Sequence, residues 1–137
     1  MSAFEQTLRE VLASGNRARF QASGDSMYPT IRSGDTVEIE PCDPASLRPG
    51  DIVLAATVRG LTLHRIVRIS SARIVIQGDN ALVSDAPVAM ENILGRTVEE
   101  EPIKNGWRRR SEKVIIIRFA AAIVRRLRAR FLALFVV

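Results

Sequence analysis

The 137-residue sequence contains one cysteine, Cys42, and one histidine, His64. A single cysteine excludes an intrachain disulfide and a cysteine-based metal cluster, and with only one histidine beside it we expect no zinc site. The sequence also lacks a phosphate-binding glycine loop. We therefore predict that the protein uses neither a metal nor a cofactor.

The N-terminal segment lacks a long apolar run. Phe4, Leu8, Val11 and Leu12 recur at helical spacing among charged residues, and Ser14-Gly15-Asn16 is a plausible stop. This pattern predicts an amphipathic helix in residues 1–19, and neither a signal peptide nor an N-terminal membrane span.

The middle of the chain is rich in short β-branched segments with alternating polarity. With 47% apolar residues, the chain can bury a core. Five closely spaced strands predict a mainly β domain over residues 20–103, a curled sheet or partial barrel. The expected strands are Thr36–Glu40, Asp51–Val58, Leu61–Ile69, Arg73–Gln77 and Ile93–Glu99.

Residues suited to nucleophilic catalysis occur within this β region. Ser26 follows Gly24 and precedes Pro29, which favours a rigid, irregular backbone, and His64 lies in an expected strand. A serine needs an imidazole to take its proton and a carboxylate to fix the imidazole tautomer, which Asp79 or Asp85 could supply. The alternatives are a turn serine, a half-buried strand histidine and loop aspartates, or a weaker Cys42–His64 pair.

Four segments occur in an order that resembles type I signal peptidases and the related LexA-like serine peptidases, over residues 20–98. They are Gly24-Asp25-Ser26-Met27-Tyr28-Pro29, Arg48-Pro49-Gly50-Asp51-Ile52-Val53, Leu63-His64-Arg65-Ile66-Val67 and Gln77-Gly78-Asp79-Asn80. His64 stands where the other bacterial branch has a lysine, so the sequence most resembles the Ser-His-Asp branch of the endoplasmic reticulum, archaea and some bacteria. The only lysines, Lys104 and Lys113, lie beyond the strand-rich region, and arginine stays protonated, which disfavours a Ser-Lys dyad.

The resemblance implies a role for each matching residue. Ser26 would be the nucleophile, His64 the general base, and Asp85 the acid that orients His64, with Asp79 as the competing candidate. The oxyanion hole would use the Ser26 N–H and a backbone donor at Gly24. Extended peptides with small residues before the cut would bind a shallow apolar groove near Met27, Tyr28 and Ile31.

Residues 104–137 form a basic tail with a pattern typical of an amphipathic helix from Val114 onward. Five arginines make a bilayer span costly, so we expect this helix to lie on an anionic membrane surface as a peripheral anchor. The alternatives are packing on the β domain, on a second copy of the chain, or on a partner protein. The net charge of +5 does not indicate nucleic-acid binding here, because the arginines concentrate in the tail with few aromatics between them.

These observations predict a serine endopeptidase that cleaves a peptide or precursor protein in trans. Self-cleavage of the repressor kind is disfavoured, because Ala-Gly and Cys-Gly dipeptides are absent. The alternative is a non-catalytic module that keeps the fold and captures extended peptides by strand addition.

Overall fold

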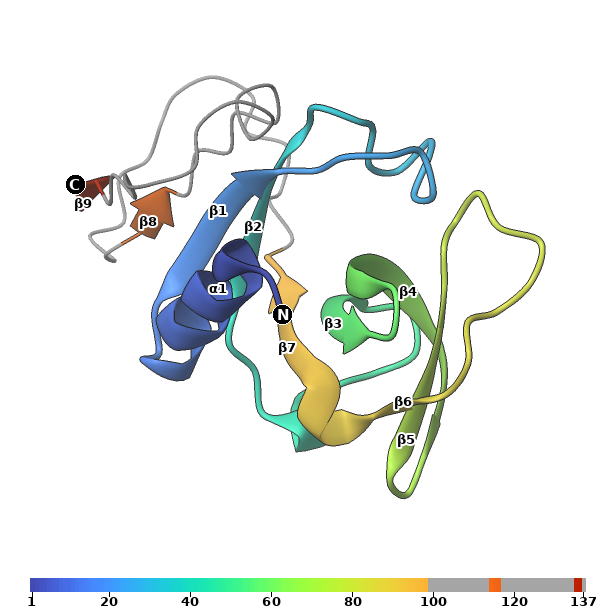
Figure 1. The fold of residues 1–137 in the computed structure, drawn as a ribbon. Coiled ribbons are helices and arrows are strands. Elements are labelled where there is room, and N and C mark those ends of the chain that lie inside the picture. Colours follow the sequence, from blue (N-terminus) through green and yellow to red (C-terminus); the bar gives the residue numbers. More distant parts are fainter. Residues whose placement is uncertain (99–113, 117–134, 137) are drawn as a thin grey trace.

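The computed structural model describes residues 1–98, 114–116 and 135–136. These residues form one sheet with the strand order β6-β5-β4-β3-β7-β2-β1-β8-β9, and one α-helix beside it (Figure 1). Neighbouring strands are antiparallel except β1 and β8, which are parallel. Within the described part, the sheet is curled but does not close into a barrel, which confirms the expected mainly β class.

All five expected strands are present with small shifts in their bounds. They are β2 (Thr36–Glu40), β3 (Ile52–Thr57), β4 (Gly60–Ser70), β5 (Arg73–Gln77) and β7 (Ile93–Thr97). Within residues 1–98, two further strands were not expected, β1 (Arg17–Gln21) and the two-residue β6 (Val88–Ala89). Short 3-10 turns precede β3 and β7, at Pro44–Ser46 and Met90–Asn92.

The N-terminal helix α1 spans Ala3–Ala13 and begins at Ser2, whose side chain accepts a hydrogen bond from the Glu5 N–H. It ends before Gly15, which has a φ of +82°. The helix therefore ends at the expected Ser14-Gly15-Asn16 stop, while residues 17–19 of the expected N-terminal segment 1–19 belong to β1. In β1, Ala18 lies opposite Ile39 of β2, and the side chains of Arg17 and Arg19 both donate to Glu38 across the sheet. Apolar and charged residues therefore alternate with the period of two that is typical of a strand.

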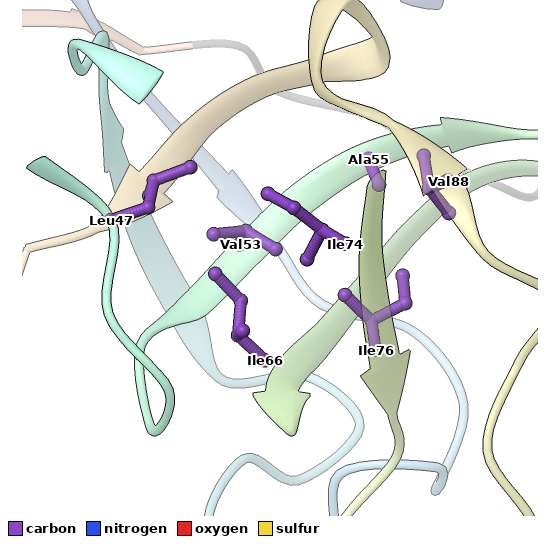
Figure 2. Packing of buried hydrophobic residues seen from close by; sticks show 7 residues of the cluster. All are labelled: Leu47, Val53, Ala55, Ile66, Ile74, Ile76 and Val88. Carbon is purple, nitrogen blue, oxygen red and sulfur yellow. The ribbon is translucent and has the colours of Figure 1, made fainter. Parts of the chain in front are cut away.

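Two apolar clusters share strand β3. Leu54 packs with the buried face of α1, while Val53 and Ala55 belong to a second cluster between β3, β4 and β5. Figure 2 shows the second cluster, which consists of Leu47, Val53, Ala55, Ile66, Ile74, Ile76 and Val88. Because β3 is covered on both faces, its position is fixed. It pairs with β4, and this pairing places Val53 of β3 opposite His64 of β4.

The expected C-terminal helix is wrong at both of its described ends. Val114–Ile116 forms β8 beside β1, and Phe135–Val136 forms β9 beside β8. Val-Ile-Ile is a β-branched run that suits a strand, and β1 offers it a sheet edge. The rest of the predicted tail and membrane-binding segment, residues 104–113 and 117–134, lies outside the described residues, as does the boundary expected near 103. Among the residues that are described, no helix has the length and apolar character to cross a membrane.

Candidate active site

Ser26 lies in the loop of residues 22–35 that joins β1 to β2, here called the Ser26 loop. The loop is closed at its base, because the Ala22 N–H donates to the Asp35 carbonyl over 2.8 Å and the Gly34 N–H donates to the Ala22 carbonyl over 2.8 Å. Met27 is buried and anchors the loop, whereas Ser26 is exposed. The loop thus exposes the Ser26 side chain on a backbone that is restrained by the hydrogen bonds at its base and by the buried Met27.

A second loop, residues 78–87 between β5 and β6, supports the Ser26 backbone. The Asn80 N–H donates to the Ser26 carbonyl over 2.9 Å, and Asn80 Nδ2 donates to the Asp25 carbonyl over 3.2 Å. In Figure 1 this yellow loop lies next to the light-blue Ser26 loop. Gly78 allows the close approach, since a Cβ there would lie 2.5 Å from the Ser26 carbonyl oxygen.

His64 on β4 is the buried polar residue of the described core, with 8% of its surface exposed. Its Nδ1 is hydrogen-bonded to the Asp85 carboxylate. Because an ionised carboxylate only accepts, Nδ1 carries the proton and Nε2 keeps its lone pair in the neutral ring. Nε2 faces Gly78 on the side of the Ser26 carbonyl, 3.0 Å from where a Gly78 Cβ would stand.

Asp85 reaches His64 because the loop after β5 folds back on the strand. The Asp85 N–H donates to the Ile76 carbonyl over 2.9 Å. Gln77 ties the loop from within, donating from Nε2 to the Ala81 carbonyl over 2.8 Å and accepting from Ser84 Oγ over 3.0 Å. These three hydrogen bonds therefore hold the loop that carries Asp85 against the end of β5.

Asp79, the competing acid, binds other partners. Its two carboxylate oxygens accept from Arg65 Nε over 2.8 Å and Arg65 Nη2 over 2.7 Å, and Oδ2 also accepts from Thr30 Oγ1 over 2.6 Å. The hydrogen bonds from Arg65 are the main reason that the pKa of Asp79 lies below its ordinary value. Of the two aspartates, the structure brings Asp85 to His64 and Asp79 to Arg65.

An open groove of about 890 Å³ runs along these residues. Ser26, His64 and Asp85 all line it, as do Gly24, Met27 and Ile31 from the expected binding positions. Tyr28 is not among the lining residues and is 49% exposed, with the Arg32 guanidinium 5.7 Å from its ring centre. Of the expected binding positions, the structure therefore brings Gly24, Met27 and Ile31 to the groove and leaves Tyr28 outside its lining.

Gly24 and Ser26, the expected oxyanion donors, both line the groove. The N–H groups of Gly24 and Ser26 donate to none of the residues that the structure describes. Ser26 Oγ likewise makes no hydrogen bond to the described residues, His64 included. Catalytic hydrogen bonds often tighten only when substrate binds, so the absence of a Ser26–His64 bond is compatible with an enzyme that has no substrate bound.

Cys42 lies away from the groove. It packs against the second apolar cluster, near Leu47, and burial is the main reason that the pKa of its thiol is raised. A raised pKa disfavours the thiolate that nucleophilic attack needs. The raised pKa and the position of Cys42 outside the groove lining both disfavour the Cys42–His64 alternative.

The Asp79 pKa gives a pH-dependent prediction. As the pH falls below about 3.8, the ordinary value, the unfolded chain takes up this proton before the folded chain does, so the stabilisation from Asp79 is lost toward its lower folded pKa. We expect parent and Asp79→Asn to differ in unfolding free energy by a constant amount above about pH 5. Urea unfolding at several pH values should show that difference shrinking in acid, and a difference that grows in acid would contradict it.

Three residues that support the site were not assigned from the sequence. Arg65 and Thr30 are brought to Asp79 only by the fold. Asn80 donates to the Asp25 carbonyl, which is 55 residues away in sequence. The one sequence signal was the Gly78-Asp79-Asn80 segment, a turn-like run directly after a strand.

Two comparisons with known proteins bear on the family of the chain. A search of curated proteins found no match. A protein-family model described as Peptidase S24-like matches residues 4–98, which include all of α1 but its first residue, both loops and every strand from β1 to β7. This match supports the expected grouping with LexA-like and signal-peptidase-like proteins at the level of the superfamily. The Ser-His-Asp branch stays a prediction, but the chain itself belongs to the Peptidase S24-like family.

Proposed function

We propose that the protein is a serine endopeptidase in which Ser26 is the nucleophile, His64 the general base and Asp85 the residue that orients His64. The observation that carries the proposal is the hydrogen bond between His64 Nδ1 and Asp85, which in the neutral ring leaves the lone pair on Nε2, the nitrogen that faces the Ser26 loop. The same pair supports placing the chain in the Ser-His-Asp branch.

In this mechanism Ser26 Oγ attacks the scissile carbonyl carbon while its proton passes to His64 Nε2. Asp85 stabilises the imidazolium that forms. The oxyanion accepts hydrogen bonds from the N–H groups of Ser26 and Gly24. Nε2 then gives the proton to the leaving amine as the C–N bond breaks, and water, activated by the same nitrogen, hydrolyses the ester on Ser26.

The substrate class follows from the groove and from the family likeness. An open, partly apolar groove suits a peptide in extended form, and Met27 and Ile31 line the part next to Ser26. We expect small residues before the cut, as in signal-peptidase substrates, and precursor proteins as the natural substrates.

A non-catalytic peptide-binding module is the second candidate. It is favoured by one observation, the missing hydrogen bond between Ser26 Oγ and His64 in the described structure. Such a module would bind extended peptides in the same groove.

One experiment separates the two. The parent, Ser26→Ala and His64→Ala proteins are incubated with a library of extended peptides, and products are identified by mass spectrometry. Cleavage by the parent alone, with a fluorophosphonate adduct on Ser26, is the expected result. Peptide binding without cleavage in all three proteins would contradict the peptidase and support the binding module.

A further inference from the structure

We propose that Arg65 is a positioning residue, which holds the Ser26 loop against the His64 strand by way of Asp79 and Thr30. The inference rests on the proposed function, because it concerns the placement of the Ser26 hydroxyl. It adds a second attachment of the loop, distinct from the one that Asn80 makes.

The first link is the ion pair between Arg65 and Asp79. Arg65 follows His64 on β4, so its side chain leaves the opposite face of the strand. Nε and Nη2 donate to the two carboxylate oxygens over 2.8 and 2.7 Å, a bidentate pairing that fixes the plane of both groups.

The second link joins this pair to the Ser26 loop. Thr30 lies four residues after Ser26 and donates from Oγ1 to Asp79 Oδ2 over 2.6 Å. Asp79 thus bridges β4 and the loop, with one oxygen shared between the two. Removal of the Thr30 hydroxyl would break this link and leave the ion pair intact.

The guanidinium is itself anchored. Arg65 Nη1 donates to the Gly50 carbonyl over 2.8 Å, and the Gly50 N–H donates to the Ile66 carbonyl over 2.8 Å. The turn that holds Gly50 is closed by Asp51, which accepts from the Arg48 N–H over 2.8 Å. Arg65 therefore has a fixed position from which to hold Asp79.

Besides its closed base and the buried Met27, the Ser26 loop has two attachments to the loop of residues 78–87. Asn80 holds the carbonyls of Asp25 and Ser26, and Asp79 holds Thr30 on the far side. With only the first, the loop can pivot about Asn80. Because a displacement of about 1 Å can lower a rate about 100-fold, the second attachment matters for reactivity. It matters less for folding, since half-exposed ion pairs stabilise proteins only weakly.

The sharpest test uses Thr30→Val, which keeps the shape and loses the donor, with Thr30→Ser as the matched variant that retains it. Asp79→Asn and Arg65→Lys break the other link, and Arg68→Lys on the same strand is the control. We expect Thr30→Val, Asp79→Asn and Arg65→Lys to lower kcat about 10- to 100-fold with KM within about twofold, while Thr30→Ser and Arg68→Lys keep the parental kcat.

Amide hydrogen exchange gives a readout that needs no activity. The N–H groups of Tyr28 and Ile31 are bonded within the loop, to Asp25 and Met27, and should exchange faster in Thr30→Val than in Thr30→Ser. Parental exchange in Thr30→Val, an unchanged kcat, or a fall in kcat that follows a loss of folded protein would overturn the inference. An inactive parent would refute the peptidase instead, and the exchange comparison would still decide whether the loop is held.

Discussion

Asp85→Asn is expected to lower kcat about 10⁴-fold while the protein stays folded. The asparagine fits the same space, but its amide nitrogen can donate to His64 Nδ1 where the carboxylate could only accept. Donation to Nδ1 moves the ring proton to Nε2, so the nitrogen that faces Ser26 can no longer take a proton. The measurement is steady-state cleavage of the best library peptide, with KM and kcat determined separately.

Asp79→Asn is the matched control, because it removes the same charge from the same loop. It leaves the Asp85–His64 bond intact, so its fall in kcat should be at least tenfold smaller than that of Asp85→Asn. An equal or larger loss in Asp79→Asn would assign the orienting role to Asp79. Parental activity in Asp85→Asn would refute the proposed mechanism.

Gly78→Ala is expected to lower kcat at least about 100-fold by moving the Ser26 backbone. The new methyl group would lie 2.5 Å from the Ser26 carbonyl oxygen and 3.0 Å from His64 Nε2, the first of which is shorter than real Cβ contacts. The loops must separate, and the Asn80 N–H bond to the Ser26 carbonyl then lengthens or breaks. Labelling of Ser26 by a fluorophosphonate measures the effect directly on the nucleophile, because the reagent does not fill the peptide groove.

Gly95→Ala on β7 is the control for a general packing defect. A Cβ there would lie 2.4 Å from the Glu40 carbonyl oxygen, so the strain is similar, but Gly95 does not line the groove. We expect Gly95→Ala to lower the melting temperature with a parental labelling rate per folded molecule. Parental labelling in folded Gly78→Ala would show that the close approach does not position Ser26.

Alternation of β-branched and polar residues was enough to predict the strands that build the site. The unexpected β1 shows the limit of such patterns. Ala18 and Phe20 suit both a continuation of the N-terminal helix and a strand, and the pairing with β2 determines that they form a strand. The same ambiguity affects Val114–Ile116, where helical spacing predicts a helix. The strand β8 forms there because β1 offers a sheet edge, which the sequence pattern does not reveal.

The choice between the two aspartates shows why a site is harder to predict than a strand. Both follow β5 in one loop, and spacing alone does not show which returns to β4. The Asp85 N–H bond to Ile76 makes that return, and Arg65 draws Asp79 to the other face. The resemblance named Asp85 first, but neither contact can be derived from composition or periodicity.

The burial of β3 on both faces gives α1 an indirect influence on the strand that carries His64. Leu54 links the strand to the helix cluster, and its neighbours Val53 and Ala55 link it to the cluster below His64. The two cores are therefore thermodynamically coupled, since neither can loosen without exposing one side of the strand that pairs with β4. We therefore expect truncation of α1 to loosen the backbone of His64, the proposed base.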